Sequence, residues 1–216
     1  MKLRKKDLIS LIQNTEPFKN PKIALEQYTI DALSAVDIIY FAGVEFNDIY
    51  DKYLVDLGAG TGRLSIASAL LTPKCVFSID IDVEALSILN ENTNKIELEV
   101  PILPICCDVS FIPLKLRKLS KLFPITTLMN PPFGVQTPKA DRAFLKSAMH
   151  FSDVIYSIHL SDVKVRDFIR RYIYKLEWKI DYILSLPLIL ERAFPFHTQK
   201  RKEIQVDLYR FLKRNN

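Results

Sequence analysis

One short stretch of the chain can bind and activate a planar amino group: Asn130-Pro131-Pro132-Phe133. The Asn130 side-chain oxygen and the Pro131 carbonyl can each accept a hydrogen bond from an exocyclic NH₂. Pro131 and Pro132 fix φ and remove two N–H groups, so these carbonyls face no competing donor. Phe133 offers a ring on which a flipped base can stack. Such hydrogen bonds draw the nitrogen towards tetrahedral geometry, so the four residues predict a catalytic site for transfer to an amino nitrogen.

The predicted chemistry requires neither a metal ion nor a strong base. The nitrogen sheds its proton after transfer, so catalysis rests on positioning and electrostatics. The cysteines also disfavour a metal site: Cys75, Cys106 and Cys107 each lie in an apolar, strand-like run. Adjacent side chains at 106 and 107 would point to opposite faces of a strand, which suits neither a disulfide nor a metal pair. We expect no metal, and buried, reduced thiols.

A second motif is a glycine-rich turn upstream of the first, in Val55-Asp56-Leu57-Gly58-Ala59-Gly60-Thr61-Gly62. Glycines between a strand and a helix let the backbone approach a ligand closely. Only one residue separates the second and third glycines, whereas a dinucleotide fingerprint needs two and seats a pyrophosphate on the helix. Asp56 would repel a phosphate but suits a cationic amino-acid group. The turn that contains Gly58 and Gly60 is therefore predicted to hold an adenosine-containing sulfonium cofactor, which carries no phosphate.

Acidic residues also end the strands that follow the glycine turn. Asp80 closes Val76-Phe77-Ser78-Ile79-Asp80, where a carboxylate can accept hydrogen bonds from ribose hydroxyls. Asp108 follows the next strand and is placed to receive an adenine amino group. Asp82 competes with Asp80 for the ribose but is expected to cap the following helix. Any one of these acids could instead be an ordinary helix cap or turn residue. Taken together with the glycine turn, the acids predict a binding site for an adenosine.

Alternating helical and strand-like patterns must position both motifs. We expect strands at 53–57, 75–80, 102–107, 125–129, 153–159, 178–186 and 203–212. Helices are expected at 5–13, 29–42, 63–71, 83–93, 141–150 and 162–175. This alternation predicts a mainly parallel sheet with helices on both faces, and the last two strands predict an antiparallel C-terminal edge hairpin. The expected fold class is α/β: a Rossmann-like class I methyltransferase with a seven-stranded sheet.

Length and composition indicate a single intracellular domain. The chain has 216 residues, 49% hydrophobic and 25% charged, which excludes a disordered chain and allows one sizeable core over residues 1–216. No apolar run reaches the roughly 18 residues that a bilayer span needs. The basic N-terminus is not followed by the apolar segment of a signal peptide. We expect a cytoplasmic protein without membrane contact.

The net charge of +5 is concentrated in the last quarter of the chain. Residues 161–216 hold 13 Lys and Arg against 7 Asp and Glu, whereas residues 1–160 hold 17 against 18. A positive region of this kind would attract a polyanion. The helix expected at 162–175 carries basic residues partly on one stripe, and a phosphate-binding face and a plain solvated face are equally supported. These residues are Arg166, Arg170, Arg171 and Lys175.

Stretches along nearly the whole chain resemble the methyltransferase-like protein five family. They are Leu25-Glu26-Gln27-Tyr28, Met129 to Gly134, Asp141 to Leu145, Tyr156-Ser157-Ile158-His159, Phe196-His197 and Glu203 to Leu208. The family comprises archaeal and eukaryotic enzymes that methylate N6 of an adenine in small-subunit ribosomal RNA. The resemblance implies S-adenosylmethionine as the cofactor and RNA as the substrate.

The resemblance also implies roles for individual residues, with Asn130 to Phe133 as the catalytic loop. The cofactor contacts that it implies are Gln27, Tyr28, Thr29, Gly58, Thr61, Asp80, Asp108 and Val109. The family motif Q-Y-P-T reads Gln27-Tyr28-Thr29-Ile30 here, so the threonine is displaced by one position. The basic cluster after His197 lies two positions later than in the family. It comprises Lys200, Arg201 and Lys202, which are expected to bind RNA phosphate.

Two further expectations concern the surroundings of the site. Residues 1–45 are expected to form an N-terminal helical cap over the cofactor. The resemblance implies a partner, a small zinc-binding methyltransferase activator protein that completes one edge of the sheet. A chain this apolar could expose a patch for such a partner.

Two other functions remain open. N-P-P-Y/F loops also occur in methyltransferases that act on protein glutamine or on guanine N2; Phe133 and the basic C-terminal quarter favour nucleic acid. The remaining alternative is a non-catalytic RNA-binding module, which would need neither Asn130 nor the glycine turn. The chemistry of the motifs does not separate RNA from DNA, because the 2′-hydroxyl is read by other contacts.

Overall fold

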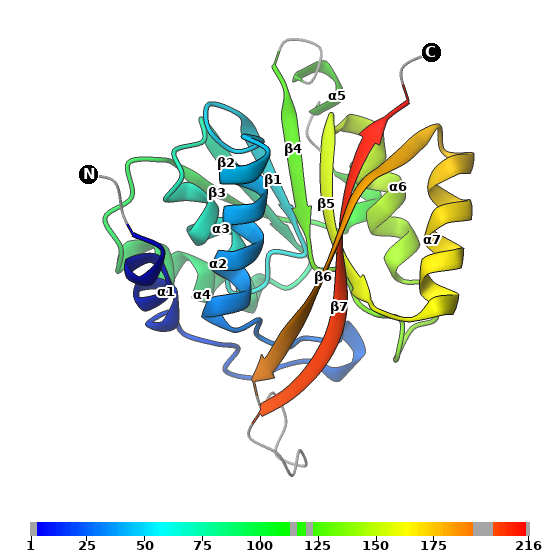
Figure 1. The fold of residues 1–216 in the computed structure, drawn as a ribbon. Coiled ribbons are helices and arrows are strands. Elements are labelled where there is room, and N and C mark those ends of the chain that lie inside the picture. The colour runs from blue at the N-terminus through cyan, green and yellow to red at the C-terminus, as the bar shows by residue number, and fades with distance from the viewer. Residues whose placement is uncertain (1–3, 113–115, 120–122, 192–200, 215–216) are drawn as a thin grey trace.

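The computed structural model describes residues 4–112, 116–119, 123–191 and 201–214. Its centre is a seven-stranded sheet in the order β3-β2-β1-β4-β5-β7-β6 (Figure 1). The strands are β1 (Tyr53–Leu57), β2 (Cys75–Asp80), β3 (Ile102–Cys106), β4 (Ile125–Met129), β5 (Val154–Leu160), β6 (Trp178–Glu191) and β7 (Arg201–Lys213). β1 to β5 are parallel, whereas β7 is antiparallel to both β5 and β6. The predicted α/β fold class is confirmed.

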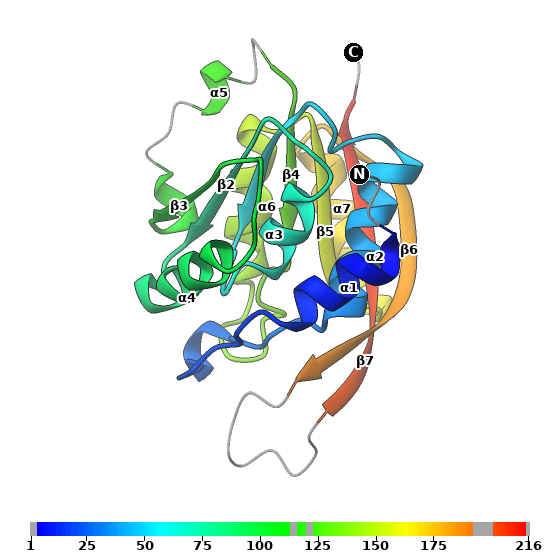
Figure 2. The ribbon, with the colours of Figure 1, turned by 90° about the vertical axis from the view of Figure 1, so that its left-hand side faces the viewer.

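The C-terminal hairpin of β6 and β7 is longer than its sequence pattern predicts. β6 continues past residue 186, through Pro187, to Glu191. A proline is accommodated here because β6 is the edge strand, where a missing N–H can face the open side. The hairpin projects beyond the carboxyl ends of the parallel strands (Figures 1 and 2). Its far end returns to the N-terminal region, where Leu190 pairs with Ile30 in an isolated antiparallel bridge.

Helices cover both faces of the sheet because side chains alternate along each strand. Leu54 packs into a core with α1 (Lys5–Gln13), α2 (Ala32–Tyr40) and α3 (Arg63–Ala69). Val55 and Leu57 pack into a second core with α6 (Asp141–Phe151) and α7 (Val163–Lys175). Figure 1 shows the first group to the left of the sheet and the second to its right. α4 (Val83–Asn94) packs against β2 and β3.

Several short elements carry no periodic pattern and were not predicted. They are η1 (Ile23–Leu25), the π-helix η2 (Phe41–Glu45), η3 (Val109–Phe111) and α5 (Leu116–Leu119). The helix expected at 29–42 begins later, at Ala32, because Asp31 is its N-cap and accepts a hydrogen bond from the Ser34 N–H. After Tyr40 the chain continues as η2 without a break.

The cysteines are only partly as expected. Cys75 is buried, but Cys106 is exposed and Cys107 is half-buried; none of the three forms a disulfide. Cys106 ends β3, an edge strand of the described sheet, and Cys107 directly follows it. Among the described residues, no group of three or more His, Cys, Asp or Glu could hold a metal ion. Nor does any helix within these ranges have the length and apolar character to cross a membrane.

Candidate active site

The two sequence motifs meet at one end of the sheet. Leu57, Ile79 and Met129 lie in register on adjacent parallel strands, so the residues that follow them share one edge. A pocket of about 350 Å³, here called the first pocket, opens at this edge. Its lining includes the predicted residues Gln27, Tyr28, Thr29, Gly58, Gly60, Thr61, Asp80, Asp108, Val109, Asn130 and Pro132. Three other predicted site residues, Asp56, Pro131 and Phe133, lie outside this lining.

Asp80 holds the glycine turn against the end of β2. One carboxylate oxygen, Oδ2, accepts the Gly60 N–H at 2.8 Å, and Oδ1 accepts the Asp82 N–H at 2.9 Å. Burial raises the pKa of Asp80, although both N–H donors oppose the increase. Gly60 has φ +53°, and a Cβ there would lie 2.8 Å from the Phe18 ring. The position therefore requires glycine for its backbone conformation and for space.

Asp56 does not face the first pocket, which corrects the expectation of a direct cofactor contact. It shares a sheet face with Leu54, and its Oδ2 accepts a hydrogen bond from the Ser65 hydroxyl of α3 at 2.6 Å. Its Oδ1 is buried and has no hydrogen-bond partner in the described chain. Burial raises the pKa of Asp56 to about 7. The alternation along β1 directs this carboxylate into the α3 layer rather than towards the strand end.

Asp108 and Val109 close the pocket beyond β3. Asp108 is the N-cap of η3 and accepts a hydrogen bond from the Ser110 N–H at 2.7 Å. It is an exposed residue that lines the pocket, whereas Val109 is buried and contributes an apolar wall. Asp82, the alternative ribose ligand, caps α4 as expected, by accepting the Glu84 N–H.

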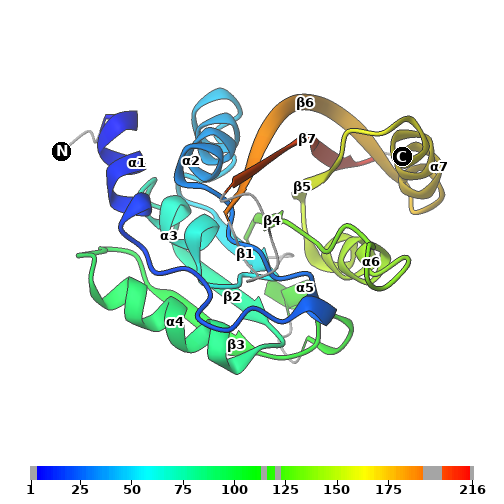
Figure 3. The same ribbon diagram turned by 90° about the horizontal axis from the view of Figure 1, so that it is seen from below.

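The cover of the first pocket is the connection between α1 and α2, residues 14–31, here called the strap. Figure 3 shows it crossing the ends of β1 and β2. Gln27 is buried and fastens the strap: its Nε2 donates to Asp82 Oδ2 and its Oε1 accepts the Lys22 N–H, both at 2.7 Å. Only the segment 18–30 of the expected N-terminal cap contributes lining residues. The cap is therefore largely non-helical where it meets the site.

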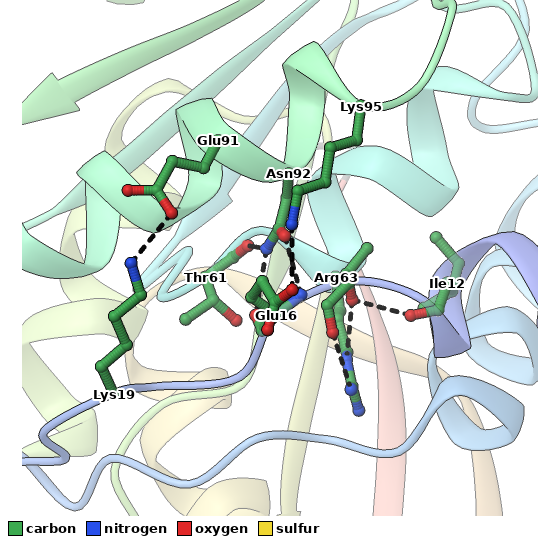
Figure 4. A network of polar contacts seen from close by, with 9 residues as sticks. Ile12, Glu16, Lys19, Thr61, Arg63, Glu91, Asn92 and Lys95 are labelled. Carbon is green, nitrogen blue, oxygen red and sulfur yellow. Dashed lines mark hydrogen bonds and ion pairs between the residues drawn. The ribbon is translucent and has the colours of Figure 1, made fainter.

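Two buried residues that were not predicted as site residues anchor the strap (Figure 4). Asn92 Nδ2 donates to the carbonyls of Glu16 and Thr61, and its Oδ1 accepts the Glu16 N–H at 2.7 Å. Arg63, the first residue of α3, donates from Nη1 to the Ile30 carbonyl at 2.6 Å and from Nε to Thr15 Oγ1 at 3.1 Å. The available sequence signal was a polar Asn92 on the apolar stripe of α4.

The acceptor loop, Asn130 to Phe133, is held by Tyr28 of the strap. The Tyr28 hydroxyl donates to Asn130 Oδ1 at 3.3 Å, and its ring stacks on Phe133 with centroids 5.4 Å apart and planes at 25°. Glu26 adds a second link, because its Oε1 accepts the Gln136 N–H at 2.8 Å. The strap thus connects the cofactor side of the site to the acceptor loop.

Phe133 lines a second pocket, of about 220 Å³, that opens beside the acceptor loop. It lies among the end of β5 and the beginnings of α6 and α7. Its lining comprises Phe133, Lys139, Asp141, Arg142, His159, Leu160, Lys164, Val165 and Phe168. His159 is buried and lies 2.7 Å, through Nε2, from Ser157 Oγ; burial lowers its pKa to about 3. This histidine is therefore neutral at physiological pH.

The predicted RNA-binding cluster falls where the structure gives no test. Lys200 and the nearby His197 lie outside the described residues, and the same holds for the side chains of Arg201 and Lys202 in β7. Arg166, from the basic stripe of α7, donates from Nε and Nη2 to the buried Asp207 at 2.6 and 2.8 Å. It connects α7 to β7, which favours a structural role over a phosphate contact at this position.

One part of the chain matches a known family model. The model describes the ribosomal protein L11 methyltransferase (PrmA) and matches residues 41–106. This range contains the glycine turn and Asp80 and ends before the acceptor loop. The match therefore concerns the cofactor side of the fold and not the acceptor.

Other relatives are similar over the whole chain. The rRNA N(6)-adenosine-methyltransferase METTL5 of Danio rerio is 35% identical and aligns over 97% of this chain and 99% of its own. Mettl5 of Drosophila melanogaster, which has the same description, is 34% identical over 98% and 96%. A crystal structure of a candidate RNA methyltransferase from Pyrococcus horikoshii superposes with a TM-score of 0.85, at 35% identity, over 98% of this chain and 99% of that one.

Proposed function

The chain belongs to the METTL5 family of rRNA N(6)-adenosine-methyltransferases, and we propose that it transfers a methyl group from S-adenosylmethionine to N6 of an adenosine in small-subunit ribosomal RNA. The observation that carries the proposal is that Asn130 and the glycine turn line one pocket. A donor site and an acceptor for an amino group thereby share a single space. We also propose that the enzyme is cytoplasmic and that residues 1–216 form a single domain.

The first pocket suits a cationic, adenosine-containing cofactor. Its lining carries three acids, Glu26, Asp80 and Asp108, and one cation, Arg63. The Arg63 guanidinium is directed to the protein itself, because it donates to the Ile30 carbonyl and to Thr15. A volume of about 350 Å³ is within the usual range for small-molecule pockets. S-adenosylmethionine would supply the electrophilic methyl group when bound. The acidic lining favours a sulfonium over a phosphate-bearing nucleotide.

Different residues around the first pocket are proposed to bind different parts of this cofactor. The glycine turn presents backbone, and Asp80 and Asp108 offer carboxylates for the ribose and the adenine amino group. Asp80 already accepts two N–H groups, which keeps its carboxylate oriented. Phe18 and Tyr28 close the pocket from the strap side. Tyr28 also touches the acceptor loop, so the strap relates cofactor and substrate to one another.

Asn130 is the proposed acceptor of hydrogen bonds from the adenine amino group. A carboxamide oxygen has two lone pairs, so it can accept from the Tyr28 hydroxyl and from the substrate together. The Tyr28 bond orients the oxygen before the adenine arrives. The Pro131 carbonyl supplies the second acceptor, and no N–H of Pro131 or Pro132 competes. Catalysis then consists of holding the nitrogen lone pair in line with the methyl group.

A partner protein is proposed for the open edge of β3. Leu103 on this strand is 44% exposed, and Phe111 in the following η3 is 80% exposed. An uncovered strand edge with apolar side chains can pair with a strand of another protein. We place the small zinc-binding activator there. The test is co-purification with the activator and loss of the complex in the Leu103→Asp variant; a stable, fully active chain that does not bind it would refute this part.

A labelling experiment tests the proposed reaction. The protein is incubated with methyl-labelled S-adenosylmethionine and separate fractions of small-subunit rRNA, DNA and ribosomal protein, and the products are digested to nucleosides or amino acids. We expect N6-methyladenosine from small-subunit rRNA and far less of it, in the same time, with Asn130→Ala. Label in glutamine or guanosine would overturn the assignment, and no label in any fraction would favour a binding module.

A further inference from the structure

The second pocket is positively charged, and its cations are not neutralised. Lys139, Arg142 and Lys164 line it together with one acid, Asp141. In the part of the chain that the structure describes, none of these three cations forms an ion pair with an acid. By contrast, Lys19 and Lys22 of the strap pair with Glu91 and Asp82 at 3.0 and 2.6 Å, and Lys95 pairs with Glu16 of the strap at 2.9 Å.

The surrounding side chains hold this charge in place without cancelling it. The Arg142 guanidinium lies over the Phe168 ring, 4.6 Å from its centroid, and its Nε is buried without a hydrogen-bond partner in the described chain. His159 is neutral and does not add charge. Its Nδ1 lies 3.9 Å from Asp141 Oδ2, so this contact is not an ion pair at neutral pH. A basic recess with free donors remains.

The position of the recess relates it to the substrate. Phe133 is both a wall of this pocket and the ring proposed to stack on the target adenine. A flipped nucleotide on Phe133 carries a phosphate on each side of its ribose, close to the loop. Lys and Arg are the side chains that bind phosphate through charge-assisted hydrogen bonds. The pocket has room for a phosphodiester and part of a sugar in about 220 Å³.

We propose that the second pocket binds a backbone phosphate of the RNA directly adjoining the target adenosine. This inference rests on the proposed function and adds a substrate subsite to it. Lys139 approaches from the loop before α6, Arg142 from α6 and Lys164 from the first turn of α7. The subsite fixes the position of the nucleotide while Asn130 binds its base. It thereby separates recognition of the backbone from recognition of the amino group.

The test compares two variants from which the same number of charges is removed. One is Lys139→Ala/Lys164→Ala; the control is Lys146→Ala/Lys179→Ala, whose lysines are exposed and lie outside both pockets. Binding of a single-stranded rRNA oligonucleotide is measured over a range of salt concentrations. We expect the pocket variant to lose about tenfold in affinity and its salt slope to fall by about 0.7 for each phosphate charge that it no longer neutralises. The control should change little.

A neutral linkage in the RNA then identifies the phosphate. The oligonucleotide carries a methylphosphonate at the linkage 5′ or 3′ to the target adenosine. At one of these two linkages, the methylphosphonate should lower the affinity of the wild type for the RNA. The pocket variant, which already lacks the phosphate contact, should bind the modified and unmodified RNA almost equally well. Equal losses in both proteins at both positions, or equal effects of the two double variants, would overturn the proposal. Unchanged S-adenosylmethionine affinity shows that the variants are folded.

The same samples separate this inference from the proposed function. If the wild type forms N6-methyladenosine in the oligonucleotide and the two double variants behave alike, the subsite is wrong and the function stands. If the wild type does not methylate adenosine, the proposed function itself fails.

Discussion

The two pockets beside the acceptor loop carry opposite charge and are built in different ways. The first is lined by Glu26, Asp80 and Asp108 and is covered by a strap whose Lys19 and Lys22 are paired with acids. The second is lined by Lys139, Arg142 and Lys164 with one acid, Asp141, and these three cations form no ion pair among the described residues. One suits a sulfonium cofactor and the other a polyanion. Opposite charge on the two sides of Asn130 can keep the two ligands in their own places.

The pockets also differ in how firmly their walls are fixed. The strap is held by buried groups such as Asn92, Arg63 and Gln27, each with hydrogen bonds to backbone or to a carboxylate. The cations of the second pocket lie on exposed or half-buried side chains. A preorganised cofactor site costs little reorganisation when the ligand binds. A site for RNA binds more tightly when its cations are not already paired with acids and can contact phosphate.

The largest effect is expected from a substitution in the acceptor loop, which lies between the two pockets. Asn130→Ala removes the oxygen that accepts the amino group, so the rate of methyl transfer should fall by about 10²–10³, or roughly 2–4 kcal/mol of transition-state stabilisation. Affinities for cofactor and for RNA should change far less than the rate, because Asn130 is one of many residues that line the first pocket and does not line the second. Single-turnover rates at saturating ligands measure the loss. Turnover close to that of the wild type would remove Asn130 from the mechanism.

Asp56 lies behind the first pocket, and its raised pKa should make the free energy of unfolding depend on pH. Burial raises the pKa of Asp56 from 3.8 to about 7, so between about pH 4 and 7 the folded chain keeps a proton that the unfolded chain has lost. Over this window stability should fall as pH rises, by roughly 3 kcal/mol in all, and level off above about pH 7.

Asp56→Asn removes this titration and serves as the comparison. The difference in Tm between wild type and variant, measured without cofactor, should shift steadily in favour of the variant from pH 4 to 7. A difference that does not change with pH would show that Asp56 is ionised throughout. Any constant offset between the two proteins does not affect the result.

The strap gives a test confined to the cofactor side. Asn92→Ala leaves the Glu16 backbone groups and the Thr61 carbonyl without a partner, at a cost of roughly 2 kcal/mol. Cofactor affinity should fall by at least tenfold while RNA affinity is unchanged. The neighbouring Glu91→Ala removes only an exposed ion pair with Lys19 and should cost less than about 0.5 kcal/mol. Calorimetry with both ligands distinguishes the two variants; equal losses would mean that the strap is not anchored through Asn92.

The smallest effect is expected from the contact that joins the pockets. Tyr28→Phe keeps the stack on Phe133 and removes one neutral hydrogen bond to Asn130, worth about 1 kcal/mol. The methylation rate at saturating ligands should fall about fivefold with cofactor affinity retained. Tyr174→Phe, at an exposed position of α7, is the matched control. A faster Tyr28→Phe enzyme would show that the hydroxyl competes with the substrate instead of orienting Asn130.

Local patterns were sufficient for most of the fold. β1, β2 and β4 begin and end where their apolar runs do, because short buried strands are bounded by residues that break them. The same reasoning missed η1 and α5, which are too short to be periodic. The hairpin was recognised, but its length was not: an apolar pattern does not show that β6 is an edge strand able to tolerate Pro187.

Within the site, the groups that come directly after strands could be predicted from the amino-acid sequence. The glycine turn, Asp80, Asp108 and Asn130 reach one pocket because parallel strands end at the same edge of a sheet. Asp56 was misplaced because strand alternation points its side chain into the α3 layer. The anchoring of the strap by Asn92 joins residues 76 positions apart. The second pocket collects Phe133, His159 and Lys164 from separate elements. The strap anchor and the second pocket could be found only in the folded chain, because both depend on contacts between distant segments that leave no local pattern.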